Sequence, residues 1–256
     1  MILAIDQGTT GTTCIVFDDR GRAAGRSYRE LRQHFPRPGW VEHEAGEIWD
    51  VTLAVAGDAL ADAGVRGADL TGVGITNQRE TVVAWDRSTA EPLHRAIVWQ
   101  DRRTAARCEE LRESGHEELV RARTGLVLDP YFSGTKMEWL VREGVAGPES
   151  ALGTIDAWLA YKLTGRHLTD YSNASRTLLF DTAELRWDEE LCDLLGVPRS
   201  CLPEAVPSSQ VYGETDAFGG SVPVAGIAGD QQAALYGQAC HAEGRGKSTF
   251  GTGSFL

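Results

Sequence analysis

The stretch Asp6-Gln7-Gly8-Thr9-Thr10-Gly11-Thr12-Thr13 lies between two short apolar runs, residues 1–5 and 14–17. Apolar runs joined by a glycine-rich polar turn predict a β-hairpin. Glycine lets the backbone approach a ligand, and amides and hydroxyls supply neutral donors. An aspartate at the end of the first strand can hold a hydrated magnesium ion. The stretch therefore predicts a polyphosphate site, with an ordinary turn as the alternative; it lacks the Gly-Lys-Ser/Thr ending of a P-loop.

The composition is that of a globular protein, with 256 residues, 42% hydrophobic and 24% charged. A formal net charge of −12 opposes binding to nucleic acid or to anionic membranes, and no apolar run is long enough to span a bilayer. The five cysteines are an odd number without a Cys-x-x-Cys pair. They argue against a disulfide framework and a zinc site, and favour a reducing, cytoplasmic location.

Hydrophobic periodicity predicts an antiparallel three-stranded meander over residues 2–28 and then alternating strands and helices. This order indicates an α/β fold with a mixed sheet flanked by helices. Without a linker-like stretch, residues 1–238 are expected to form one domain. Strands are predicted at 2–6, 13–18, 23–28, 73–76, 81–86, 96–99 and 222–228, and helices at 47–63, 101–114 (capped by Asp101), 134–142, 155–163 and 230–237.

The run Gly226-Ile-Ala-Gly-Asp-Gln-Gln232 delivers a carboxylate, Asp230, from a strand end into the first turn of a helix. Open α/β sheets bind ligands at this position, and such a carboxylate can accept a proton from a hydroxyl that attacks phosphorus. A simple helix N-cap is the alternative. Gly251-Thr252-Gly253-Ser254 repeats the chemistry of the first turn, so two turns are expected to grip a nucleotide from opposite sides. The chain ends in this second hairpin, which suggests a fragment.

The pair Arg79-Glu80 ends another predicted strand. Neighbouring hydroxyls of a polyol can each donate to Glu80 and accept from Arg79. Trp99 and Tyr131 are candidates to pack against the carbons of such a polyol. The competing interpretations are a surface ion pair and ordinary core packing.

Several motifs together resemble the glycerol kinases, which belong to the FGGY carbohydrate kinases of the actin and heat-shock ATPase superfamily, with its ribonuclease H-like fold. The resemblance covers the whole chain, whereas the family enzyme is about twice as long. It implies an N-terminal FGGY domain at residues 1–238 and the first hairpin of a C-terminal FGGY domain at 239–256. The motifs are Asp6-Gln-Gly-Thr-Thr10, Gly39-Trp-Val-Glu-His43, Gly74-Ile-Thr-Asn-Gln-Arg-Glu-Thr81, Ile97-Val-Trp-Gln100, Asp129-Pro-Tyr-Phe-Ser-Gly-Thr-Lys136, Asn173-Ala-Ser-Arg-Thr177 and Gly226-Ile-Ala-Gly-Asp-Gln-Gln-Ala-Ala234.

The resemblance also implies a reaction, ATP-dependent phosphorylation of glycerol, and a role for each matching residue. Asp230 would be the catalytic base, and Asp6 would anchor Mg²⁺ through water. Glycerol and ATP would be the ligands, no nucleic acid or membrane partner is expected, and homo-oligomerisation stays open. The glycerol site would comprise Arg79, Glu80, Trp99, Tyr131, Asp230, Gln231 and Phe255, and the phosphate site Thr9, Thr10, Gly11 and Thr252.

Two departures from the family pattern are relevant. Thr13 replaces an arginine that reaches the phosphates in many members, and the segment 216–221 lacks the basic residues with which some members bind the inhibitor fructose 1,6-bisphosphate. We therefore expect no such inhibition. Two other functions remain open: an FGGY kinase for a pentulose or gluconate, and a non-catalytic, actin-like nucleotide-binding module, which would not need the Arg79-Glu80 pair.

Overall fold

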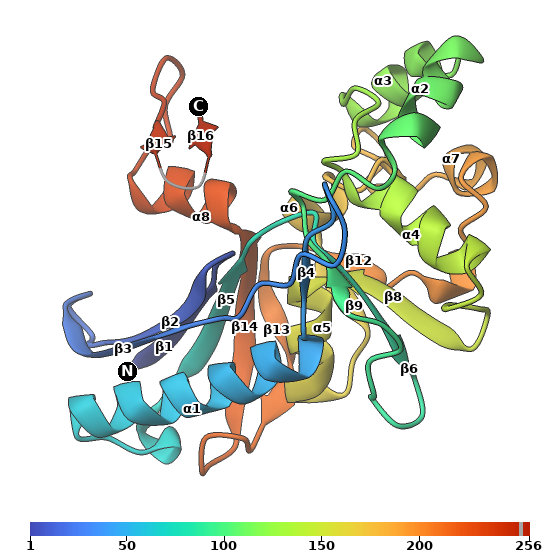
Figure 1. The fold of residues 1–256 in the computed structure, drawn as a ribbon. Helices are drawn as coiled ribbons and strands as arrows, with labels where there is room; N and C mark the ends of the chain where they lie inside the picture. Colours follow the sequence, from blue (N-terminus) through green and yellow to red (C-terminus); the bar gives the residue numbers. More distant parts are fainter. Residues whose placement is uncertain (251–252) are drawn as a thin grey trace.

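The computed structural model describes residues 1–250 and 253–256, and its centre is a six-stranded mixed sheet (Figure 1). The predicted meander is confirmed, since β1 (Ile2–Gln7), β2 (Gly11–Phe17) and β3 (Ala23–Glu30) pair antiparallel. On its other side β1 pairs in parallel with β5 (Gly72–Asn77), which pairs in parallel with β14 (Val222–Gly229). An antiparallel β13 (Ser209–Thr215) completes the order β13-β14-β5-β1-β2-β3, so the expected α/β fold with a mixed sheet is confirmed.

Two helices, α1 (Ala45–Ala63) and α5 (Ile155–Thr164), cover one face of this sheet. Side chains alternate between faces along a strand, and Leu3, Ile5 and their large neighbours on β2, β5 and β14 point to the helices. The helices also join each other, because the indole of Trp158 donates a hydrogen bond of 3.0 Å to the carbonyl of Ala45. The opposite face carries small residues such as Ala4 and Gly74 and borders a cavity of about 670 Å³.

A second, antiparallel sheet has the order β4-β7-β6-β8 and packs with α2, α3, α4 and α7 around a second core. Strand β6 joins the two cores, because Val83 and Trp85 point into the first and Val82 and Ala84 into the second. The elements are β4 (Glu42–His43), β6 (Val82–Asp86), β7 (Ala96–Ile97), β8 (Ser150–Thr154), α2 (Ala105–Glu113), α3 (Glu117–Thr124), α4 (Ser133–Arg142) and α7 (Glu189–Leu194).

The rest of the chain consists of short elements, of which α6, α8 and the last hairpin bear on the site. Within the described residues, no helix combines the length and the apolar character that crossing a membrane requires. These elements are η1 (Gly67–Asp69), β9 (Leu168–Asp170), α6 (Tyr171–Ala174), β10 (Phe180–Asp181), β11 (Arg186–Trp187), η2 (Arg199–Cys201), β12 (Glu204–Val206), α8 (Asp230–Gly237), β15 (Thr249–Phe250) and β16 (Ser254–Phe255).

The prediction that Asp101 caps a helix is wrong. Helix α2 begins at Ala105, and Asp101 is buried before it. Its carboxylate accepts hydrogen bonds from the backbone of Val41 at 2.7 Å and of Arg103 at 2.8 Å. Asp101 therefore ties two loops together, a long-range role that a local capping pattern does not reveal.

Candidate functional site

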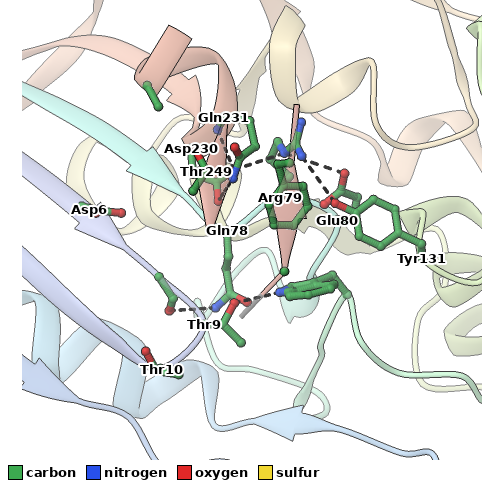
Figure 2. A pocket seen from close by; sticks show the side chains of 15 residues that line it. Asp6, Thr9, Thr10, Gln78, Arg79, Glu80, Tyr131, Asp230, Gln231 and Thr249 are labelled. Atoms are coloured by element: carbon green, nitrogen blue, oxygen red, sulfur yellow. Dashed lines mark hydrogen bonds and ion pairs between the residues drawn. The ribbon is translucent and has the colours of Figure 1, made fainter. Parts of the chain in front are cut away.

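A cavity of about 350 Å³ lies at the edge of the main sheet where the parallel strands β1, β5 and β14 end (Figure 2). Strands that run in parallel deliver their last residues to the same edge, which is why segments far apart in sequence meet here. Of the predicted site residues that the structure describes, all but Gly11 line this cavity. The lining residues are Asp6, Gly8, Thr9, Thr10, Gln78, Arg79, Glu80, Trp99, Tyr131, Asp230, Gln231, Ala234, Thr249, Gly253 and Phe255.

Asp230 is the first residue of α8, and its carboxylate faces the cavity with 37% of the side chain exposed. Gly229 holds the N-cap position, so the helix-cap alternative for Asp230 is not what the structure shows. Oδ1 accepts a hydrogen bond of 2.7 Å from the amide of Gln231, and Oδ2 accepts one of 3.2 Å from its side chain. The carboxylate is thus oriented by its neighbour and still accessible from the cavity.

The buried guanidinium of Arg79 lies beside Asp230, with 3.2 Å between Nε and Oδ1. Gly229 makes room for it, since a Cβ atom at position 229 would stand 2.6 Å from Cδ of Arg79. The two terminal nitrogens donate to Gln232 at 3.3 Å and to the hydroxyl of Tyr131 at 3.4 Å. The glycine before Asp230 is therefore required by the arginine that pairs with it.

Glu80 is buried next to Arg79 and has a left-handed backbone, with a φ of 60°. Its Oε1 accepts a hydrogen bond of 2.8 Å from Nε of Arg176, and its carbonyl accepts one from Ser133 at 3.2 Å. Burial raises the pKa of the Glu80 carboxyl, while the positive charges of Arg79, Arg176 and Lys136 act in the opposite direction. The site thus places a carboxylate acceptor beside a guanidinium donor.

Aromatic rings form one wall of the cavity. The ring of Trp99 packs edge-on against Tyr131 at 5.6 Å and against Phe255 at 6.2 Å between centroids. The indole of Trp99 donates a hydrogen bond of 2.8 Å to the hydroxyl of Thr9. Burial raises the pKa of Tyr131 to about 12, so its phenol is neutral at physiological pH. The wall therefore joins the apolar side of the cavity to the β1–β2 turn.

Lys136 holds the loop that carries Tyr131 in this wall. The sequence analysis did not assign it a role. Its ammonium group donates to the carbonyls of Pro130 at 2.6 Å, Tyr131 at 2.7 Å and Phe132 at 2.9 Å. Burial lowers the pKa of this lysine to about 7, although the negative charges of Glu80, Asp101 and Asp129 favour its charged form. Lys136 belongs to a motif that indicated the family resemblance, but only the fold shows that its ammonium group holds the loop of Tyr131.

Asp6 and the β1–β2 turn lie across the cavity from the Arg79-Glu80 pair. The surrounding protein and the negative charge of Asp230 raise the pKa of Asp6 to about 6, which marks a position where a cation is favourable. Among the described residues no cluster of three or more metal-ligating side chains occurs. A magnesium ion on phosphates needs only one or two carboxylates, so this donor set fits a nucleotide-bound ion.

Two of the predicted residues are not among those that line the cavity, for different reasons. Gly11 lies outside the cavity at the start of β2, where a Cβ would stand 2.5 Å from the carbonyl oxygen of Arg29. Thr252 lies outside the described residues. The sequence did not predict Gln78, whose side-chain amide donates to Gln7 at 3.1 Å and to the carbonyl of Gly8 at 3.2 Å. Gln78 therefore anchors the turn to the end of β5, a contact with no local signature.

Comparison with known proteins assigns the family. Residues 1–237 match the N-terminal domain model of the FGGY family of carbohydrate kinases. The chain belongs to this family. It is 58% identical over its full length to a glycerol kinase of Trichlorobacter lovleyi, of which it covers 53%, and 53% identical to that of Bacillus licheniformis, of which it covers 54%. This FGGY chain thus spans about half the length of the curated relatives it matches.

Solved structures show the same fold for this FGGY chain. The crystal structure of Plasmodium falciparum glycerol kinase with ADP superposes with a TM-score of 0.90 at 34% identity, covering 99% of this chain and 53% of the other. A gluconate kinase of Lactobacillus acidophilus superposes with a TM-score of 0.81 at 20% identity, covering 91% and 48%. The second likeness supports the fold alone, because its identity is low.

Proposed function

We propose that this chain supplies the N-terminal half of a glycerol kinase, which transfers the terminal phosphoryl group of ATP to glycerol. The observation that carries the proposal is that Asp230 shares one cavity with the Gly8-Thr9-Thr10 turn and with the Arg79-Glu80 pair. The identity to named glycerol kinases and the ADP in the Plasmodium falciparum structure support it.

In the proposed reaction, neighbouring glycerol hydroxyls donate to Glu80 and accept from Arg79, and Gln231 adds a further polar contact. Trp99 and Phe255 pack against the carbon chain. Asp230 accepts the proton of the hydroxyl that attacks the phosphorus atom. Thr9 and Thr10 line the phosphate side. Asp6 would hold Mg²⁺ through water, and the ion would neutralise phosphate charge.

The division into an FGGY N-terminal domain at 1–238 and the first hairpin of a second domain at 239–256 is part of this proposal. It is supported by the family match to residues 1–237 and by the coverage of relatives. Thr252 and Gly11 are retained as phosphate-site candidates on the resemblance alone. A second domain would close the cavity and exclude water, which otherwise competes as phosphoryl acceptor. The five free cysteines support a reducing, cytoplasmic location.

A coupled ADP-release assay tests the proposal, with the 256-residue chain and the full-length polypeptide measured side by side. We expect turnover of glycerol by the full-length polypeptide and little by this chain alone, because phosphate contacts from the second domain would be missing. A panel of glycerol, xylulose and gluconate distinguishes other FGGY substrates, since a site built for given hydroxyls rejects analogues strongly. Preference for a sugar over glycerol, or ATP binding without any acceptor, would overturn the assignment.

A further inference from the structure

Two of the carboxylates that line the cavity, Glu80 and Asp230, each make their shortest ion pair with a different guanidinium group. Arg79 has its Nε 3.2 Å from Asp230 but 3.8 Å from Glu80, and its terminal nitrogens donate to Gln232 and Tyr131. The cation that hydrogen-bonds Glu80 is Arg176, at 2.8 Å. Each carboxylate therefore has its own arginine.

Arg176 does not line the cavity; it follows α6 and reaches Glu80 from behind. Its guanidinium lies 4.9 Å from the ring centroid of Phe132 and 5.8 Å from that of Tyr131. Aromatic faces attract the cation without accepting its N–H groups in strong hydrogen bonds. The packing thus fixes the guanidinium while leaving Nε free to donate to Glu80.

Glu80 needs such a partner because its side chain is only 2% exposed. Burial raises the pKa of this carboxyl, and the charges of Arg79, Arg176 and Lys136 lower it. The other titratable groups around it are Asp230, which faces Arg79, and Tyr131, whose pKa is raised to about 12. A protonated Glu80 would lose acceptor capacity and carry a donor of its own, which would compete with hydroxyl hydrogens.

We propose that Arg176 is a positioning residue for substrate recognition, which keeps Glu80 ionised and directed into the cavity so that it accepts the hydroxyl hydrogens of a polyol. The role as a substrate contact rests on the proposed kinase function. The ion pair between Arg176 and Glu80 does not depend on that function, because both partners belong to this chain.

Arg176→Met, which keeps the apolar stem and removes the charge, tests the proposal in the full-length polypeptide. We expect the glycerol KM to rise about tenfold or more at pH 7, since a charge-assisted hydrogen bond is lost, and the ATP KM to stay within about twofold. The increase should shrink as the pH rises, because a higher pH favours the ionised form of Glu80 in the variant. Arg176→Lys should recover most of the affinity. A KM rise that is equal at all pH values would indicate a merely structural role and would overturn the proposal.

A second readout needs no substrate. The side-chain carboxyl carbon of Glu80, assigned by comparison with Glu80→Gln, is followed by ¹³C NMR against pH in the 256-residue chain. We expect its titration midpoint to move upward in Arg176→Met and to remain near the wild-type position in Arg176→Lys; an unchanged midpoint in Arg176→Met would refute the link. If Arg176→Met fails to fold, Arg176→Gln takes its place. If the wild type does not phosphorylate glycerol, the proposed function fails while the NMR titration still decides the role of Arg176.

Discussion

The carboxylate of Asp230 lies 3.2 Å from Nε of Arg79, although 151 positions separate the two residues along the chain. The ion pair joins the first turn of α8 to the segment after β5, at the edge where the parallel strands end. It leaves the carboxylate accessible to the cavity, as the proposed proton acceptor must be.

The first prediction concerns Asp230. Asp230→Asn keeps the shape of the side chain but cannot take up the hydroxyl proton, so kcat for glycerol should fall by a factor of about 10²–10⁴. Glycerol binding should change little, because most polar contacts remain. Turnover and calorimetric binding in the full-length polypeptide measure the two effects. Asp19→Asn, at a fully exposed side chain, is the matched control; unchanged turnover in Asp230→Asn would contradict the proposed role.

The second prediction concerns the hydrogen bond between Trp99 and Thr9. Trp99→Phe removes the donor and part of the apolar surface while keeping an aromatic ring, and we expect a threefold to tenfold rise in the glycerol KM, on the order of one neutral hydrogen bond. Steady-state kinetics measure it, with Trp49→Phe in α1 as control. Equal effects of the two substitutions would show that the wall is not part of the substrate site.

Lys136 provides a stability prediction for the chain alone. Lys136→Met leaves the carbonyls of residues 130–132 without their donor. We expect the free energy of unfolding to fall by about 2–4 kcal/mol in urea titrations followed by tryptophan fluorescence. Arg142→Met, on the exposed end of the same helix, should change it by less than about 0.5 kcal/mol. A loss no larger than that control would mean that the loop does not depend on the lysine.

Asp156 gives a prediction about pH. It is buried and accepts hydroxyl hydrogen bonds from Thr154 and Thr169, and burial together with the charge of Asp170 raises its pKa to about 7. The folded protein then binds a proton that the unfolded chain releases near pH 4. This stabilisation is present at low pH and is lost as the pH rises toward 7, by up to about 1.4 kcal/mol per pH unit.

Urea unfolding between pH 4.5 and 8 measures this effect as the difference between the wild type and Asp156→Asn. The asparagine variant cannot titrate, so its stability relative to the wild type should improve as the pH rises. Buried histidines His43 and His167, whose pKa values are lowered to about 4, act in the opposite direction in both proteins and cancel in the comparison. Parallel stability curves would disprove the assignment.

The segment 216–221 supports a prediction about regulation. It forms a tight turn between β13 and β14, with Gly219 donating to the carbonyl of Asp216 at 3.0 Å, and it contains no lysine or arginine. We expect no inhibition of the full-length polypeptide by fructose 1,6-bisphosphate, because the turn offers no counter-charge. A titration showing strong inhibition would refute this.

The sequence predicted every strand of the main sheet except β13, and most of the cavity wall, because these features depend on local patterns. Glycine-hydroxyl turns and polar residues at strand ends can be recognised from a few consecutive residues, as around Thr9 and Asp230. Contacts that close only through the fold were missed: Gln78 against Gly8, Lys136 beneath Tyr131, and Arg176 behind Glu80. The capping prediction for Asp101 was wrong for a related reason, since its partner Val41 lies 60 positions away in the sequence.

The left-handed backbone of Glu80 has a consequence for redesign. In an extended strand, adjacent residues point in opposite directions, yet Arg79 and Glu80 both reach the same cavity. Changing the acceptor preference by substitution at position 80 must therefore preserve an unusual torsion angle as well as a functional group. Asparagine and glutamine are compatible starting points, whereas the β-branched residues valine, isoleucine and threonine strongly disfavour this left-handed backbone. Libraries aimed at new alcohols should vary the aromatic wall first and leave this bend intact.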